Sequence, residues 1–117
     1  MRVAGFGFRD GAGVDSLCAA LALAGGRADA LATVENKLHG LTALADHTGL
    51  PVLGVSRQAL AGHSRPGSQQ VRALYGTGSV AESSALAAAG PGAVLVVGRT
   101  RSPDGQAVVA IAEGPRT

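Results

Sequence analysis

The fold class is decided by one stretch, Gly76-Thr77-Gly78-Ser79-Val80-Ala81-Glu82-Ser83-Ser84-Ala85-Leu86, followed by Ala87–Ala89, Gly90-Pro91-Gly92 and Ala93–Val97. It predicts a flexible loop, a short helix, a helix stop and a buried strand. Ser79 and Glu82 have the S-x-x-E spacing of a capping box, so we expect Ser79 to cap the helix. Gly90 suits a left-handed residue at the helix end, and Pro91 prevents the helix from continuing. The glycines before the helix would also let its first N–H groups approach an anion, although an ordinary loop–helix–strand joint has the same pattern.

Outward from this stretch, strands and helices alternate. Expected strands are Arg2–Phe8, Asp29–Glu35, Pro51–Val55, Ala93–Val97 and Ala107–Ala112. Expected helices run from a cap at Asp15 or Ser16 through Ala24, from Gly40 to His47, over Gln58–Ala61 and from Ser68 to Gly76. The turn sequence Ser102-Pro103-Asp104-Gly105 makes the last two strands an antiparallel hairpin. Residues 1–117 are therefore expected to form a single α/β domain, a three-layer α/β/α sandwich with a mixed sheet of about five strands and a C-terminal β-hairpin.

Composition restricts the classes of partner. The chain is 46% hydrophobic and 15% charged, with no Trp, one Tyr and two Phe, so its core must be built from Ala, Val and Leu. So few aromatic side chains argue against binding of single-stranded nucleic acid, and no dense Lys/Arg run suggests nucleic acid or a membrane. Residues 57–101 carry five arginines and one acidic residue, a net charge of +4 that is compatible with a small anionic partner.

The cysteine and histidine residues suggest neither a disulfide nor a metal site. A single cysteine excludes an intramolecular disulfide, and its apolar neighbours suggest that Cys18 is a small buried thiol. His39, His47 and His63 fit no standard zinc spacing, and we expect no metal site. No apolar run approaches the roughly 20 residues of a membrane span, so a cytoplasmic protein is expected.

Three further patterns resemble parts of known binding or catalytic sites. The run Gly5-Phe6-Gly7-Phe8-Arg9-Asp10-Gly11 is one residue too long for the common dinucleotide-binding fingerprint, which argues against a nicotinamide or flavin site. Ser79, Ser83 and Ser84 lie in no G-x-S-x-G nucleophile motif. Lys37, the only lysine, follows the second strand at its carboxyl end, where α/β sheets bind ligands, although a solvated surface charge is the alternative.

Several segments, taken in order, resemble the CobE / CbiG C-terminal domain family of cobalamin (vitamin B12) biosynthesis. Gly5-Phe6-Gly7-Phe8-Arg9 with Gly11 is similar to the family's opening G-x-G-x-R-x-G, and Ala32-Thr33-Val34-Glu35-Asn36-Lys37 to its A-T-I-D-x-K. The stretch Gly76–Leu86 is similar to its G-T-P-S-V-A-E-A-A-A-L. Gly40-Leu41, Leu44-Ala45, Gly49-Leu50-Pro51 and Val108–Ala112 also match. The chain departs from the family at Gly78, where the family has Pro, at Glu35, where it has Asp, and at Gly98-Arg99, where it usually has Pro-Lys.

The resemblance implies a cobalamin (porphyrin-pathway) biosynthesis protein that binds or hands on a corrin or precorrin intermediate of the aerobic route. It favours a tetrapyrrole-binding accessory protein over an enzyme, because CbiG proteins carry an N-terminal region that this sequence does not include. The alternatives are a cobalt-precorrin-5A hydrolase that opens a lactone, or a docking module for other cobalamin-pathway enzymes. The resemblance implies that the corrinoid is the ligand and that there is no separate cofactor. It assigns no catalytic residue. The expected ligand-binding residues are Gly5, Gly7, Phe8, Arg9, Thr33, Lys37, Thr77, Gly78, Ser79, Glu82 and Arg99.

Overall fold

The structure is a computed structural model and describes residues 1–56 and 77–114. The helices expected over Gln58–Ala61 and from Ser68 to Gly76 lie outside the described residues. In chain order the elements are β1 (Arg2–Phe8), α1 (Val14–Leu23), β2 (Ala30–Val34), the 3₁₀-helix η1 (Glu35–Leu41), α2 (Thr42–Thr48), β3 (Val52–Val55), α5 (Thr77–Ala89), β4 (Val94–Arg101) and β5 (Ala107–Glu113).

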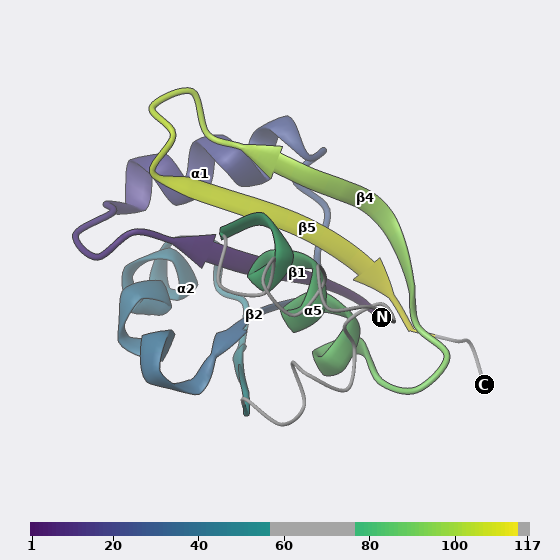
Figure 1. Cartoon of the computed structure of the whole chain (residues 1–117). Helices are drawn as coiled ribbons and strands as arrows, with labels where there is room; N and C mark the ends of the chain where they lie inside the picture. The colour runs from purple at the N-terminus through teal and green to yellow at the C-terminus, as the bar shows by residue number, and fades with distance from the viewer. Residues whose placement is uncertain (57–76, 115–117) are drawn as a thin grey trace.

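The five strands form one mixed sheet in the order β3-β2-β1-β5-β4. β1, β2 and β3 are parallel, whereas β5 is antiparallel to both β1 and β4. β1 therefore lies at the centre of the sheet, and six of its seven residues are buried. The arrangement confirms the predicted mixed sheet with its C-terminal hairpin (Figure 1).

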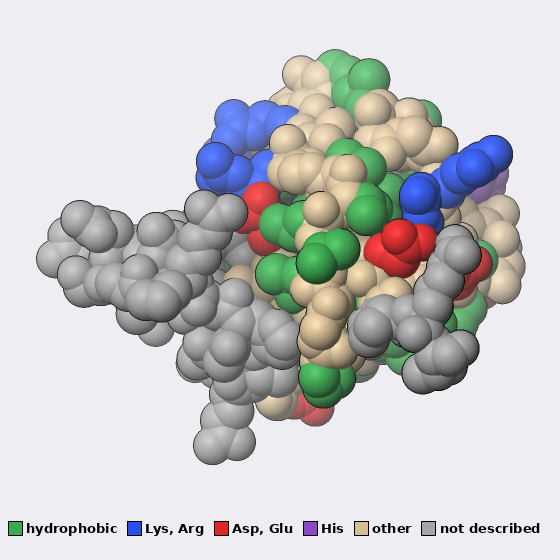
Figure 2. Space-filling view, turned by 90° about the vertical axis from the view of Figure 1, so that its right-hand side faces the viewer, with side chains coloured by type: hydrophobic (Ala, Val, Ile, Leu, Met, Phe, Trp, Pro, Cys, Tyr) green, Lys and Arg blue, Asp and Glu red, His purple; other side chains and the backbone are tan. Residues whose placement is uncertain are grey.

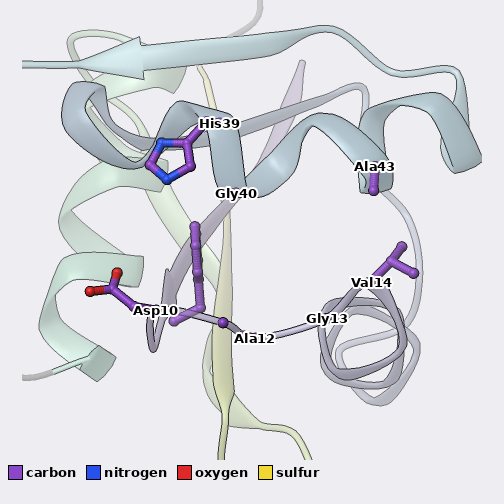
Figure 3. A pocket seen from close by; sticks show the side chains of 9 residues that line it. Asp10, Ala12, Gly13, Val14, His39, Gly40 and Ala43 are labelled. Carbon is purple, nitrogen blue, oxygen red and sulfur yellow. The ribbon is translucent and has the colours of Figure 1, made fainter.

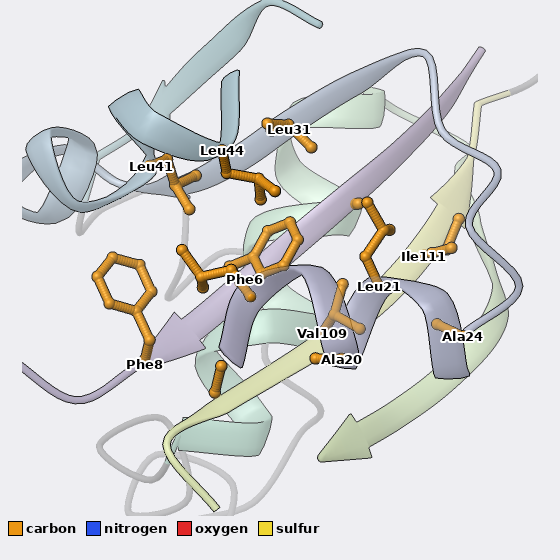
Figure 4. Packing of buried hydrophobic residues seen from close by; sticks show 13 residues of the cluster. Phe6, Phe8, Ala20, Leu21, Ala24, Leu31, Leu41, Leu44, Val109 and Ile111 are labelled. Carbon is orange, nitrogen blue, oxygen red and sulfur yellow. The ribbon is translucent and has the colours of Figure 1, made fainter. Parts of the chain in front are cut away.

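Helices cover both faces of the sheet, as expected for three layers (Figure 1). On one face, α1 and α2 pack over a cluster that includes Phe6, Leu31, Leu44 and Ile111 (Figure 4). On the other face, α5 lies directly against β1. A Cβ at Gly5 would collide with the carbonyl oxygen of Ala81 and the backbone nitrogen of Ala85. The absence of a side chain at Gly5 thus sets how closely α5 approaches the sheet.

The start of α5 corrects the prediction of a capping box. Thr77 and Gly78 are already helical, so Ser79 lies inside the helix and cannot be its N-cap. Packing against β1 positions this helix, and such tertiary contacts commonly outweigh a local capping signal. The predicted end is confirmed, because Gly90 has the left-handed φ of +99°.

Other boundaries differ from the prediction as well. Gly13, not Asp15 or Ser16, is the N-cap of α1, and no side chain caps that helix. The expected helix from Gly40 to His47 is divided into η1 and α2, which ends as predicted at the left-handed Gly49. β4 continues to Arg101 because its ladder with β5 reaches the pair Arg101–Val108.

Hydrogen bonds to one carboxylate, that of Asp104, connect the β4–β5 turn to α1. Asp104 accepts hydrogen bonds from the Ser102 hydroxyl at 2.6 Å, from the Gln106 backbone N–H at 3.0 Å and from the Ser16 hydroxyl. The Ser102 and Ser16 hydrogen bonds hold the pKa of Asp104 below its ordinary value of 3.8. Ser16 therefore joins the turn instead of capping its own helix.

We expect Asp104→Asn to lower the free energy of unfolding at pH 7. A carboxyl whose pKa is lower in the folded chain stabilises the fold above its unfolded pKa, and this stabilisation is lost as the pH falls through the folded value. The difference between wild type and variant in urea unfolding should therefore shrink between pH 7 and about pH 2. Asp46→Asn, at an exposed position on α2, is the charge-matched control. A difference that is independent of pH would contradict the role given to the Asp104 carboxylate.

Candidate functional site

The candidate site lies at the edge of the sheet where β1, β2 and β3 end, called here the carboxyl edge. Because β4 is antiparallel to β5 and β5 to β1, β4 also ends at this edge, with Arg101 level with Val108 and Gly7. α5 also begins at this edge. Its middle covers Gly5, and its last residue, Ala89, lies so close to Gly114 that a Cβ there would contact it. Because Gly114 hydrogen-bonds to Met1, directly before β1, the end of α5 lies at the opposite edge. The carboxyl ends of strands in α/β sheets are the usual place for ligands.

Lys37 is held at the end of β1. Its Nζ donates hydrogen bonds to the Phe8 carbonyl oxygen at 3.1 Å and to Asp10 Oδ1 at 2.6 Å, and lies 5.2 Å from the centre of the Phe8 ring. The Lys37 side chain is 27% exposed, whereas that of Asp10 is 92% exposed. The Lys37 hydrogen bond and charge lower the pKa of Asp10, with a smaller contribution from His39. The only lysine is therefore an anchored cation at the carboxyl edge.

A pocket of about 400 Å³ opens next to this ion pair. It is lined by Phe8, Asp10, Gly11, Ala12, Gly13, Val14, His39, Gly40 and Ala43. Figure 3 shows Asp10 and His39 together at one end, with Val14 and Ala43 at the other. The pocket therefore has a polar end and an apolar end, and this pocket is called the Phe8 pocket below.

A glycine contact shapes one wall of the Phe8 pocket. A Cβ at Gly40 would collide with the ring of Phe8. The glycine therefore lets η1 lie directly against that ring, which is itself only 8% exposed.

The other residues expected to bind ligand occupy different surroundings. Thr33 is 1% exposed, and its hydroxyl donates to the Phe6 carbonyl at 2.9 Å. Gly5 is covered by α5, and Gly7 is buried. Arg9 is exposed directly after β1, and its backbone N–H donates to the Gln106 carbonyl at 3.0 Å.

The expected residues beyond β3 are farther from Lys37. Thr77, Gly78 and Ser79 form the first turn of α5, and Glu82 is half-buried in its second. Arg99 is exposed within β4, not after it, and β5 separates β4 from β1, a distance of about 10 Å between those strands. Of the expected residues, Phe8 and Lys37 are in direct contact, and Arg9 follows Phe8 in the chain.

Four residues at this edge were not predicted: Asp10, His39, Gly40 and Arg101. Asp10 follows β1 in a turn and His39 lies in η1 after β2, and the meeting of these two segments depends on tertiary structure. The signal for Arg101 was present, because Arg99 and Arg101 are two residues apart and share one face of a strand that continues past Gly98.

Two serines on α5 and the cysteine lie at buried or half-buried positions. Ser83 and Ser84 are buried on α5, and the Ser84 hydroxyl has no hydrogen-bond partner. Cys18 is half-buried against the core, and desolvation, with a smaller contribution from Asp15, raises the pKa of its thiol. Over residues 1–56 and 77–114, no three His, Cys, Asp or Glu side chains are grouped as metal ligands. None of the helices described there has the length and apolar character needed to cross a membrane.

The family match and the similar solved structures agree with one another. Residues 2–112 match the family described as cobalamin synthesis G C-terminus. The crystal structure of the cobalamin biosynthesis protein ChiG from Agrobacterium tumefaciens strain C58 is similar, with 32% identity and a TM-score of 0.77, over 99% of this chain and 100% of that one. CobE, a protein from the cobalamin (vitamin B12) biosynthetic pathway, is similar with 33% identity and a TM-score of 0.71, over 96% of this chain and 89% of that one. No curated protein sequence gives a significant match.

Proposed function

Because the chain belongs to the cobalamin synthesis G C-terminal family and is a cobalamin biosynthesis protein of the CbiG/CobE type, we propose that it binds a corrin or precorrin intermediate at the carboxyl edge of its sheet. The observation that carries the proposal is the anchored cation Lys37 beside an open pocket at this edge. The protein would hold the intermediate or hand it on without changing it chemically.

Charge complementarity supports this choice of ligand. Corrin intermediates carry several carboxylates around the ring, and arginine and lysine are the side chains that bind carboxylates. Arg9, Lys37 and Arg99 would contact these carboxylates. Phe8, Glu82 and the first turn of α5, Thr77–Ser79, would contact other parts of the ligand. Gly5, Gly7 and Thr33 would support the strand ends from beneath. Because an exposed charge pair contributes little alone, affinity must come from several contacts and should weaken with salt.

We expect hydrogenobyrinic acid to bind the purified protein with a micromolar dissociation constant, roughly −8 kcal/mol, seen as a change in corrin absorbance. Arg9→Gln and Arg99→Gln should each weaken binding about two- to fivefold, because each removes one exposed charge contact. Arg27→Gln is the matched control, since Arg27 is exposed before β2, at the opposite edge of the sheet. Absence of any absorbance change, or equal losses in all three variants, would overturn the proposal.

A hydrolytic function is the second candidate, favoured by Asp10 and His39 lining the same pocket. In that case the pair would direct water onto the lactone of cobalt-precorrin-5A. The Lys37 contact, which lowers the pKa of Asp10 and engages its carboxylate, weighs against Asp10 as a base. Release of acetaldehyde from cobalt-precorrin-5A by this chain would establish the activity.

Docking to other pathway enzymes is the third candidate. Val94 and Val96 on the outer strand β4 are 59% and 39% exposed. Figure 2 shows hydrophobic side chains at the surface between basic and acidic groups on one side of the molecule. Co-purification with a pathway methyltransferase that survives Lys37→Ala and Arg99→Ala would favour docking over direct ligand binding.

A further inference from the structure

We propose that the Phe8 pocket receives one short alkyl carboxylate arm of the ligand, and that Lys37 exchanges Asp10 for the carboxylate of that arm. The identity of the whole ligand rests on the proposed function. The pocket, its ion pair and the exchange rest on the geometry alone.

The size of the pocket suits an arm rather than a macrocycle. At about 400 Å³ it lies near the lower end of the roughly 300–1,000 Å³ of sites that enclose a whole small ligand. A ring with several carboxylate substituents would need considerably more room. One acetate- or propionate-like substituent fits into this space with room to spare, while the ring stays outside.

The pocket lining has an apolar part and a polar part, as a short alkyl carboxylate arm does. Val14, Ala12 and Ala43 provide apolar contacts, and the Phe8 ring forms a wall. Asp10 and His39 lie at the opposite end of the pocket from Val14 and Ala43 (Figure 3). Asp10 is paired with the Lys37 amine at 2.6 Å. A chain of methylene groups that ends in a carboxylate would place each part against matching groups.

The two contacts of Lys37 are unequal, and this makes an exchange feasible. The Phe8 carbonyl belongs to a buried strand end and holds the amine in place. The Asp10 side chain is 92% exposed, and an exposed ion pair contributes little stability. Asp10 can therefore turn into water while Lys37 remains fixed, and an incoming carboxylate would restore the ion pair. Asp10 is in this sense an internal competitor of the ligand.

The first experiment needs no corrin. Propionate should shift the amide signals of Gly11–Val14 and Gly40 of the ¹⁵N-labelled full chain saturably at millimolar concentration, whereas uncharged propionamide should not. Asp10→Asn removes the competing charge and should tighten propionate binding about two- to fivefold. Lys37→Gln should abolish the shifts, Lys37→Arg should restore them in part, and Ala43→Phe should block the pocket. Asp15→Asn, with the same charge change at an exposed position outside the lining, should leave the affinity unchanged.

The second experiment repeats the variants with hydrogenobyrinic acid. Tighter binding by Asp10→Asn and weaker binding by Lys37→Gln would support the arm pocket within the proposed function. If wild type binds the corrin and neither variant changes the affinity, the arm pocket is overturned and the proposed function stands. If propionate binds as described and the corrin does not, the pocket stands and the proposed function fails. Shifts that Asp15→Asn changes as much as Asp10→Asn would overturn the exchange, because they would report only net charge.

Discussion

The Gly5→Val variant is expected to lose about 3 kcal/mol of unfolding free energy and to melt roughly 10–15 °C lower than wild type. The added Cβ would meet the Ala81 carbonyl oxygen and the Ala85 nitrogen, which are backbone atoms that cannot rotate away as a side chain could. To relieve the collision, α5 must move off the sheet and give up contacts of Ala81 and Ala85, both fully buried.

Gly98→Val is the matched control, because it makes the same change inside another strand. A Cβ at Gly98 meets nothing within 4 Å, and the position is exposed on β4. A β-branched side chain there should be neutral or slightly stabilising. Urea unfolding of both variants tests the claim, with Gly5→Ala as the milder change if Gly5→Val does not fold. Equal effects at positions 5 and 98 would contradict the packing role of Gly5.

Phe6→Ala is expected to cost about 3–5 kcal/mol, a large part of the roughly 5–15 kcal/mol that stabilises a domain of this size. Phe6 is 0% exposed and is one of only two phenylalanines in the chain, so the small residues around it cannot fill the space it leaves. Figure 4 shows its ring within the cluster that joins β1 to α1 and α2.

Leu23→Ala serves as the control for loss of a large apolar side chain. Leu23 is 60% exposed on α1, so its truncation should change stability by less than about 0.5 kcal/mol. Denaturant unfolding gives both values. A Phe6→Ala cost below about 1 kcal/mol would show that the core relaxes into the cavity, contrary to the close packing described.

The sequence predicts the sheet well, because its strands are continuous apolar runs and its hairpin has a strong turn signal. β1 was predicted with the observed bounds, Arg2–Phe8. Predictions that depended on one local signal were less reliable. Ser79 was expected to cap one helix and Asp15 or Ser16 another, yet α5 starts before Ser79, and Ser16 bonds to Asp104, 88 residues away. A distant partner of this kind leaves no mark in the local sequence.

The same distinction applies to the candidate site. Lys37 could be singled out because it follows a parallel strand, and position in a strand is readable from the apolar pattern. Its pairing with Asp10 and the Phe8 carbonyl depends on how closely η1 approaches β1, which Gly40 permits by leaving room for the Phe8 ring. Only the folded chain shows that Asp10 and His39 line one pocket.

The pairing of β1 with β5 also determines when this protein can fold during its synthesis. Seven residue pairs join the two strands, from Arg2–Glu113 to Phe8–Ala107, so the partners are between 99 (107 − 8) and 111 (113 − 2) residues apart in the chain. At about 5–20 residues per second, a ribosome makes β1 at least about 5 s before β5. Until then the central strand has one unpaired edge, which invites association with neighbouring nascent chains. β5, which is translated long after β1, thus completes the pairing of the central strand, and a chaperone that shields the unpaired edge of β1 until then would raise the yield of folded protein.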